Sequence, residues 1–413
     1  MASHPRIAFT GNIGNAHYAI AVALRDAGIE AHLFIGADDP LAWRPETDEP
    51  SLAGAYPDWI HEGHWYGRAN VATPWRAPLV EAVRSFDMVV ASGSTPAFVH
   101  FADIPTVFFS MGGDLTVRPF PITFRKLRGG LLSQASHAVL SAWQRRAIRQ
   151  ADQIWTQPFA PFMDAIDRLG IDRGRVADAY FPLIVDTTTF TPDRTQAREQ
   201  PWVQQATDGA DFVVFSPTRL VFAESPEMRR SGQWKGSQTL LDAFAEFVRR
   251  EVADFPVLVL PDWVLSNDVA DAKHRVVEMG IADHVRFVTP PRPEGFNRSE
   301  LVDLYNAADV AVDEFGSGWF GFVSLEAMAC GTPVVSRIDE PAIRTLYGDD
   351  WCWLSAPNAS DAANRFETLA RDREFAHDLG TQARSWIERH HSATAATSRY
   401  VQAVTDSVAE LVT

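Results

Sequence analysis

Short apolar runs alternate with amphipathic stretches along most of this 413-residue chain. The first apolar run, Arg6 to Phe9, is followed by residues 16–27, where apolar positions recur at helical spacing, and then by Gly28 and a second apolar run at 30–35. Short apolar runs predict buried parallel strands, and a period of 3.6 residues predicts a helix. The chain therefore opens with a predicted strand, helix and strand, and we expect an α/β fold built on a doubly wound parallel sheet.

A second series of predicted strands and helices starts at Phe212 to Ser216. It follows a polar stretch near 190–205 that begins with Pro192 and whose composition is typical of a boundary between domains. A chain of this length also favours two domains of ordinary size over a single large one. We therefore expect two α/β domains joined near residues 190–205.

The stretch Asp313 to Val335 combines a glycine-rich loop with a helix. The apolar run 310–312 leads into it, residues 323–330 favour a helix, and Gly331 marks the end of that helix. Glycines ahead of a helix let backbone N–H groups approach a ligand, and the helix N-terminus favours negative charge. Glu326 lies one turn inside the helix, where a carboxylate can accept hydrogen bonds from hydroxyl groups. We interpret the stretch as a site for a phosphate-bearing sugar nucleotide, and the alternative is an ordinary strand–helix–strand turn.

Composition narrows the class of protein. The formal charge of −16 argues against a general nucleic-acid binder, whose binding surface would be basic. The two cysteines, Cys330 and Cys352, are too few for a disulfide framework, which favours a reducing compartment. The N-terminus lacks the charged and apolar regions of a signal peptide, and no apolar run reaches the roughly 18 residues of a transmembrane helix. We therefore expect a cytoplasmic protein.

Neither a nicotinamide cofactor nor a bound metal is expected. The first loop carries Gly11 and Gly14 in a Gly-x-x-Gly arrangement, whereas dinucleotide sites carry Gly-x-Gly-x-x-Gly. The second predicted strand ends at Gly36 and Ala37, where a dinucleotide site would place an acid. The sequence holds no acidic pair with metal-ligand spacing at a donor-site position and no Cys/His cluster typical of zinc. We expect no cofactor, with a nucleotide-diphosphate sugar as a substrate.

Residues 118–149 form a basic segment in a chain whose net charge is negative. Between Leu115 and Ala151 every charged residue is basic, and these residues are Arg118, Arg125, Lys126, Arg128, Arg145, Arg146 and Arg149. Such a segment favours peripheral contact with an anionic membrane surface or with an anionic acceptor. The alternative is a solvated helix face whose apolar positions, such as Leu140 and Trp143, belong to the core.

Part of the glycine-rich stretch resembles the signature of the family-four retaining glycosyltransferases, a GT-B family related to glycogen synthase. That signature is a Glu, seven residues, a second Glu and then Ala-Met-Ala-x-Gly-x-Pro-Val, and its second part is present here from Glu326 to Val334. The first Glu, which helps to bind the donor sugar in the family, would fall at Gly318. Asp313 and Glu314, just upstream, are the acids that could substitute for it.

The resemblance implies two Rossmann-like domains that face each other across a cleft. The implied units are an N-terminal, acceptor-side domain at 1–192, a C-terminal, nucleotide-sugar-binding domain at 193–391, and a final helix at 392–413 that crosses back to the N-terminal domain. The implied reaction moves a sugar from a nucleotide-diphosphate donor to an acceptor hydroxyl, with retention of the anomeric configuration and without a metal.

Three residues are the expected catalytic groups. Arg219 and Lys235 resemble the clamp that the family places on the donor diphosphate, and this function is favoured over the alternative of a buried, structural Arg and Lys. A departing nucleoside diphosphate carries concentrated negative charge, which fixed cations and backbone dipoles would compensate. Asp114 is placed either to orient an acceptor hydroxyl or to cap a turn. The resemblance assigns donor binding to Gly14, Gly236, Gly321, Phe322, Val323 and Glu326.

Two other functions stay open at this point. One is a different GT-B enzyme, such as a nucleotide-sugar epimerase or a phosphorylase. The other is a non-catalytic, sugar-nucleotide-binding partner of another transferase. Two departures from the family pattern favour that second alternative: Gly318 replaces the first Glu, and Ser110 and Met111 stand where many members carry a histidine.

Overall fold

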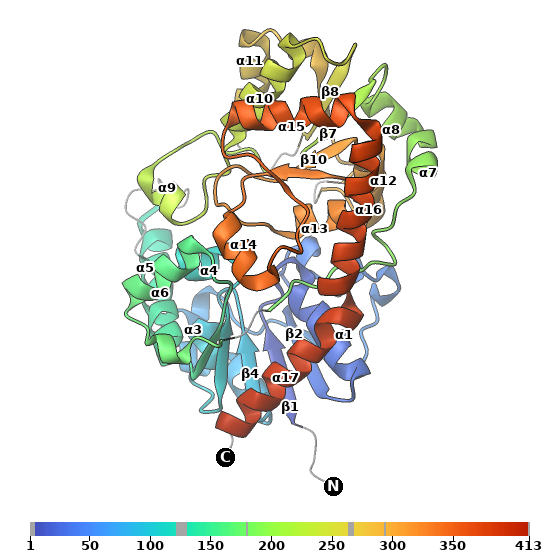
Figure 1. The fold of residues 1–413 in the computed structure, drawn as a ribbon. Coiled ribbons are helices and arrows are strands. Elements are labelled where there is room, and N and C mark those ends of the chain that lie inside the picture. Colours follow the sequence, from blue (N-terminus) through green and yellow to red (C-terminus); the bar gives the residue numbers. More distant parts are fainter. Residues whose placement is uncertain (1–4, 121–129, 179–180, 263–267, 293–294, 412–413) are drawn as a thin grey trace. The chain divides into compact units, whose positions relative to one another are not determined.

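The chain folds into two units, each built around one parallel sheet (Figure 1). The computed structural model describes residues 5–120, 130–178, 181–262, 268–292 and 295–411. One unit comprises residues 1–184 with 396–413, and the other comprises residues 185–395. Each sheet has six strands, and every pair of neighbouring strands is parallel. The expected class, two Rossmann-like α/β domains, is confirmed.

The sheet of the first unit has the strand order β3-β2-β1-β4-β5-β6. Its strands are β1 (Arg6–Thr10), β2 (Glu30–Gly36), β3 (Ile60–Gly63), β4 (Met88–Ala91), β5 (Thr106–Phe109) and β6 (Gln153–Trp155). Its helices are α1 (Ala16–Asp26), α2 (Pro78–Val83), α3 (Pro96–Val99), α4 (Gly113–Thr116), α5 (Gly130–Gln150), α6 (Ala160–Leu169) and most of α17 (Ala393–Leu411).

Strand β1 shows why this sheet carries helices on both faces. Ile7 and Phe9 belong to one buried cluster, whereas Ala8, between them, belongs to another. Side chains alternate along a strand, so an all-apolar strand has to be covered on both sides. The last helix contributes to the first of these clusters through Tyr400, whose hydroxyl donates a hydrogen bond to the carbonyl of Pro182 at 2.7 Å.

The sheet of the second unit has the strand order β12-β11-β10-β7-β8-β9. Its strands are β7 (Phe212–Phe215), β8 (Pro256–Pro261), β9 (Val285–Val288), β10 (Val310–Val312), β11 (Val334–Ser336) and β12 (Leu354–Ser355). Its helices are α7 (Arg194–Glu199), α8 (Pro201–Ala206), α9 (Pro226–Arg230), α10 (Ser237–Arg249), α11 (Val269–Glu278), α12 (Arg298–Ala307), α13 (Phe322–Ala329), α14 (Glu340–Tyr347), α15 (Ala359–Arg371) and α16 (Arg373–His390).

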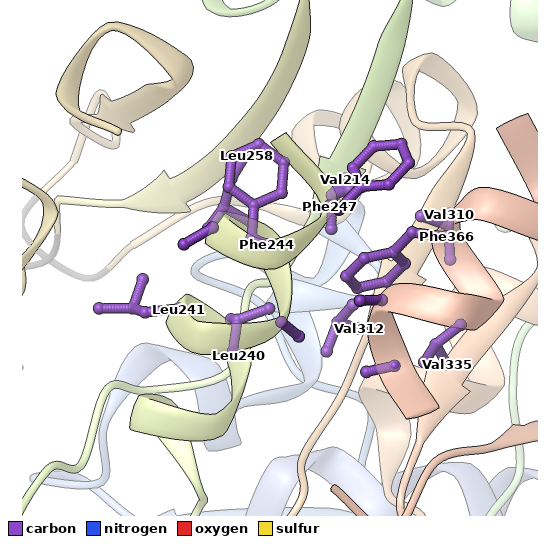
Figure 2. Close-up of a cluster of buried hydrophobic side chains, with 14 of the residues drawn as sticks. Val214, Leu240, Leu241, Phe244, Phe247, Leu258, Val310, Val312, Val335 and Phe366 are labelled. Atoms are coloured by element: carbon purple, nitrogen blue, oxygen red, sulfur yellow. The ribbon is translucent and has the colours of Figure 1, made fainter. Parts of the chain in front are cut away.

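The core of the second unit is shown in Figure 2, where helices α10 and α15 direct aromatic side chains toward the sheet. Phe244 and Phe247 come from α10, and Phe366 comes from α15; all three are fully buried. They meet the aliphatic side chains of the central strands, among them Val214 and Val312. This packing holds the carboxyl ends of β7 and β10 next to each other.

The glycine-rich stretch folds as the sequence predicts. It runs from β10 through a loop into α13 and then into β11, with Gly331 in the left-handed conformation (φ +70°) just after the helix. Apolar runs on either side of a glycine-bounded helix produce this arrangement because both strands are buried in the sheet.

Candidate functional site

The candidate donor site is built by loops that follow β7 and β10. These strands are neighbours, with Val310 opposite Val214 and Ala311 opposite Phe215, so their carboxyl ends lie side by side. Loops at the carboxyl ends of parallel strands form the ligand-binding edge of such sheets. Residues 216–221 leave β7, and residues 313–321 leave β10 toward α13.

Two glycines allow the loop after β10 to contact the turn that precedes α10. A Cβ on Gly316 would lie 1.7 Å from the carbonyl oxygen of Trp234, and a Cβ on Gly236 would lie 2.8 Å from the Cβ of Phe315. Gly236 also has a left-handed backbone (φ +68°), which favours glycine. The N–H of Phe315 donates a hydrogen bond to the carbonyl of Lys235 at 3.0 Å. The two loops therefore touch backbone to backbone.

Lys235 forms an ion pair with Glu314 at this junction. The side chain of Glu314 is 7% exposed and that of Lys235 is 23% exposed, so the pair is largely withdrawn from water. Burial raises the pKa of Glu314 to about 7; Lys235 opposes this shift, and the neighbouring Asp313 adds to it. The N–H of Ser317 donates a further hydrogen bond to Glu314 Oε1 at 3.2 Å.

Asp313 fixes the start of α13. Its Oδ1 accepts a hydrogen bond from Thr218 Oγ1 at 3.0 Å, and its Oδ2 accepts one from Ser324 Oγ at 2.8 Å. A longer contact of 3.4 Å joins the N–H of Gly321 to the same Oδ2. Asp313 thus ties the loop after β7 to the first turn of α13.

The first turn of α13 contains Phe322 and Val323, with Gly321 at the N-cap. All three residues are partly exposed, and the turn contains no acidic residue. The first N–H groups of a helix have no partner within it and carry the positive end of the helix dipole. This end of α13 therefore offers N–H donors at the same end of the sheet as Lys235.

Gly318, which stands where the resemblance places the family's first Glu, has a left-handed backbone. Its φ is +80°, a left-handed conformation in which any other L-residue is strained. Its carbonyl accepts a hydrogen bond from the N–H of Asp339 at 2.7 Å, which holds the loop in place. Among the described residues of this loop, Glu314 is the acid paired with the lysine, while Asp313 is engaged in capping α13.

Arg219 lies in the loop after β7 and is exposed. Its Nη2 donates a hydrogen bond to Gln233 Oε1 at 2.7 Å, next to the turn that carries Lys235. The N–H of Val221 donates to Ser237 Oγ at 2.8 Å, which connects the same loop to the start of α10. The structure therefore brings the predicted residues Arg219, Lys235 and Gly236 to one end of the sheet, together with the start of α13.

Glu326 has partners that the sequence did not indicate. Its carboxylate is 4% exposed, forms an ion pair with Arg298, and accepts a hydrogen bond from the hydroxyl of Tyr305 at 3.2 Å. Both partners belong to α12, so Glu326 joins α13 to α12. The expected role of Glu326 toward donor hydroxyls stays a prediction. Nothing in the local sequence around Arg298 marks it as a partner of Glu326.

Asp114 and Gly14, the other predicted residues, lie in the first unit. Asp114 accepts hydrogen bonds from the backbone N–H groups of Gly93, Met111 and Leu115, each at 3.0 Å. Burial raises the pKa of Asp114 to about 6 against the effect of these hydrogen bonds. Such contacts are those of a residue that caps a turn, and a role toward an acceptor hydroxyl stays a prediction. Gly14 has a left-handed backbone (φ 57°) between β1 and α1.

The basic segment is only partly described, because Arg125, Lys126 and Arg128 lie outside the described residues. In α5, Arg149 donates a hydrogen bond to the carbonyl of Leu169 at 2.7 Å, whereas Arg146 is exposed. None of the described helices combines the length and hydropathy needed to cross a bilayer. Within the described ranges, no group of three His, Cys, Asp or Glu side chains is arranged to hold a metal ion.

Comparison with known proteins finds a family match for part of this chain. Residues 227–386 match the family described as glycosyl transferases group 1. A D-inositol 3-phosphate glycosyltransferase of Corynebacterium jeikeium is 35% identical over 247 residues, which are 59% of this chain and 54% of that protein. The enzyme of the same name from Pseudarthrobacter chlorophenolicus is 30% identical over 58% of this chain and 52% of its own length. The matches thus span about half the length of these relatives.

Solved structures share the fold over nearly the whole chain. The crystal structure of Anabaena HepE in complex with UDP and glucose aligns with a TM-score of 0.65 at 18% identity, covering 98% of this chain and 100% of that one. Sucrose-phosphate synthase from Thermosynechococcus elongatus aligns with a TM-score of 0.66 at 16% identity, with 98% and 100% covered. The chain has the GT-B fold, and its residues 227–386 match the glycosyl transferases group 1, in agreement with the resemblance to family four.

Proposed function

We propose that this chain transfers a sugar from a nucleotide-diphosphate donor to an acceptor hydroxyl. The observation that carries the proposal is the position of Lys235, whose ammonium group lies in a largely buried ion pair where the loops around the N-terminus of α13 meet. This junction falls inside the segment that matches the glycosyl transferases group 1. A fixed cation and a helix N-terminus are the groups that stabilise a departing diphosphate.

In the proposed reaction, the bond between the anomeric carbon and the diphosphate oxygen breaks, and a bond forms between that carbon and the acceptor oxygen. The proton of the acceptor hydroxyl passes to the departing phosphate, so the new bond forms on the face that the leaving group vacates. This course retains the anomeric configuration and assigns no nucleophile to the protein. Lys235, Arg219 and the first turn of α13 compensate the charge of the diphosphate, with no metal assigned to that role.

The donor and acceptor are to be identified by direct assay. Purified protein is incubated with UDP-glucose, UDP-N-acetylglucosamine or GDP-mannose, each with and without D-inositol 3-phosphate, the acceptor named in the curated relatives. We expect release of nucleoside diphosphate that depends on acceptor, and a glycoside product whose anomeric coupling in NMR matches that of the donor. Inverted product would contradict retention. Saturable donor binding without turnover on any acceptor would identify the chain as a binding partner of another transferase.

We also propose that the basic segment 118–149 makes peripheral contact with an anionic membrane. Two large apolar side chains are exposed near it: Val139 on α5, at 41%, and Trp75, at 47%, whose ring lies 6.4 Å from that of Trp143 on α5. Exposed apolar side chains beside arginines bind an interface of anionic lipids. Sedimentation with vesicles should show binding that requires anionic lipid, weakens with salt and falls when Arg145 and Arg146 are both changed to Gln. Equal binding to neutral vesicles, or none, would contradict this contact.

A further inference from the structure

A cavity lies at the opposite end of the sheet from the candidate donor site. It has a volume of about 280 Å³. Asp309, which immediately precedes β10, and Pro333, which immediately precedes β11, contribute to its lining, and so does Gly331. The cavity therefore lies at the amino ends of β10 and β11, whereas the donor-site loop follows the carboxyl end of β10. Helix α16 provides most of the remaining lining, and Pro192, Arg194 and Cys330 complete it.

The cavity has an excess of positive charge. The guanidinium groups of Arg194, Arg373 and Arg384 line it, and Asp309 is the carboxylate among its lining residues. Arg373 Nη1 lies 3.1 Å from Asp309 Oδ1, and Arg198, just outside the lining, lies 3.4 Å from the same oxygen. Asp309 Oδ2 is occupied by the N–H of Val213 at 2.9 Å. One carboxylate therefore faces several guanidinium groups, in a chain whose formal charge is −16.

Most of the N–H donors of Arg384 already form hydrogen bonds within the chain, unlike those of Arg194 and Arg373. Its Nε donates to Glu388 at 2.7 Å, Nη1 donates to the carbonyls of Phe190 at 2.5 Å and Ala329 at 2.8 Å, and Nη2 donates to the carbonyl of Thr187 at 2.9 Å. Arg384 therefore frames the cavity and links α16 to the end of α13.

Arg194 and Arg373 retain donors within the described structure. A guanidinium carries five N–H donors. Arg194 uses Nη2 to bind the carbonyl of Ala308, and Arg373 uses Nη2 to bind the carbonyl of Asp211 at 2.7 Å and Nη1 to bind Asp309. The remaining donors of both side chains have no recorded partner among the residues described here. The side chain of Arg373 is also 48% exposed, so its guanidinium is accessible to a ligand.

The face of α16 that lines the cavity adds polar groups at helical spacing. Arg373, His377, Thr381 and Ser385 recur every four residues along it, which places them in one row. Gly380 lies beside this row, and a Cβ there would come within 2.1 Å of the carbonyl oxygen of Gly331. This glycine lets α16 approach the turn before β11 closely.

We propose that this cavity binds a small phosphate monoester through Arg194 and Arg373, with Ser385 as a neutral hydrogen-bond partner; the hydroxyl of Thr381 already donates to the carbonyl of His377 at 3.1 Å. The paired N–H donors of a guanidinium group match the oxygens of a phosphate. Several guanidinium groups around one carboxylate also carry a net positive charge, which a phosphate anion would neutralise. The volume is close to the lower limit of small-molecule pockets, roughly 300 Å³, which suits a phosphorylated metabolite and excludes a whole nucleotide sugar. The site is distinct from the donor site, and its ligand class follows from the arginines.

The binding test uses the full chain, with inorganic phosphate and glucose 6-phosphate as probes and glucose as the uncharged comparison, measured by calorimetry and thermal shift. We expect saturable binding of both phosphates and none of glucose. Arg194→Gln and Arg373→Gln should each weaken binding by roughly tenfold or more, the usual effect of losing a charge-assisted hydrogen bond. Arg371→Gln, which removes an exposed arginine of α15 paired with Glu367, is the matched control and should bind as the native chain does.

Further variants test whether phosphate binds in this cavity or in the donor site, and whether a loss of binding reflects misfolding. Asp309→Asn removes the lining carboxylate, so it should tighten phosphate binding even if it lowers the melting temperature, a result that simple structural damage cannot give. Lys235→Ala should leave phosphate binding unchanged. If Lys235→Ala abolished binding while Arg194→Gln and Arg373→Gln preserved it, the phosphate would occupy the donor site and the proposal would be overturned. Absence of saturable binding at about 10 mM phosphate would overturn it as well. Tight binding of glucose 6-phosphate with weak binding of phosphate would identify a sugar phosphate as the ligand.

Discussion

Lys235 and Glu314 form an ion pair, and a backbone hydrogen bond beside it joins the two loops that carry them. The side chains form an ion pair, and the N–H of Phe315, next to Glu314, donates to the carbonyl of Lys235 at 3.0 Å. The backbone contact fixes the lysine independently of its charge. The carboxylate holds the ammonium group in place, and an arriving diphosphate would compete for it.

Removal of the lysine should abolish most of the transferase activity. Lys235→Ala is expected to cost about 2–4 kcal/mol of transition-state stabilisation, or roughly thirtyfold to a thousandfold in kcat, because it deletes a fixed cation beside the departing diphosphate. The measurement is steady-state release of nucleoside diphosphate. Lys273→Ala, which removes an exposed lysine paired with Asp262, is the control and should turn over normally. Unchanged turnover in Lys235→Ala would refute the assignment.

The stability of the chain should depend on pH through Glu314. Its pKa is about 7 in the folded chain, against an ordinary value of 4.5. A carboxyl whose pKa is raised by folding stabilises the fold fully below its unfolded pKa, and this contribution is lost as the pH rises through the folded value. Glu314→Gln removes the titration, so the variant should gain stability relative to the native chain between about pH 5 and pH 8. Melting temperatures across this range provide the check, and parallel curves would contradict the raised pKa.

Donor binding should take up protons. If a diphosphate draws Lys235 away, Glu314 loses the partner that opposes its raised pKa, so the pKa rises further and the carboxylate becomes protonated near pH 7. Calorimetric titration with UDP in buffers of different ionisation enthalpy should therefore give different apparent enthalpies at pH 7.5. The same experiment on Glu314→Gln should give one enthalpy in all buffers. A buffer-independent enthalpy in the native chain would show that the ion pair survives binding.

The close backbone contact between the two loops predicts that even an alanine in place of Gly316 will disrupt the structure. Gly316→Ala would place a Cβ 1.7 Å from the carbonyl oxygen of Trp234, so the loops must separate. We expect a loss of about 3 kcal/mol or more in the free energy of unfolding, together with loss of donor binding. Gly321→Ala is the comparison for stability, because its Cβ would meet no atom within 4 Å and its φ is −130°. Equal denaturation midpoints for the two variants would argue against the contact.

The pairing of Arg298 with Glu326 should be visible in a double-mutant cycle. Arg298→Leu leaves the carboxylate, which is 4% exposed, without its cation, and should cost about 3–5 kcal/mol of stability. The double variant Arg298→Leu/Glu326→Gln removes both charges and should recover much of this loss. If the donor role of Glu326 also holds, the double variant will be stable but will have a raised KM for the nucleotide sugar. Additive losses of stability would mean that the two residues act separately.

The elements of the donor site were predictable because local patterns determine them. The predicted helix at 323–330 is observed as Phe322–Ala329, since apolar strands and a glycine stop bound it on both sides. The position of the glycine-rich loop at the start of that helix follows from the same pattern. The two parallel sheets follow from repeated short apolar runs, which can be buried only between layers of helices.

The partners of the charged residues could not be predicted from local patterns. Lys235 and Glu314 are separated by 79 positions, and Arg298 and Glu326 by 28. Which acid faces which base depends on the order of strands in the sheet and on how closely two loops approach. The left-handed backbone at Gly318 is likewise a property of the folded loop, in which a Glu at this position would be strained.

Arg384 has a consequence for the field around α13. It donates to the carbonyl of Ala329, the last residue of that helix, and so places a full positive charge against the negative end of the helix dipole. No acidic residue stands in the first turn itself, but Asp313 lies just ahead of it, and its Oδ2 accepts a hydrogen bond from Ser324 Oγ and a longer one from the N–H of Gly321. A charge of opposite sign therefore faces each pole of the helix. In electrostatic terms, any anion that reaches the first turn shares the positive pole with a carboxylate of the chain itself.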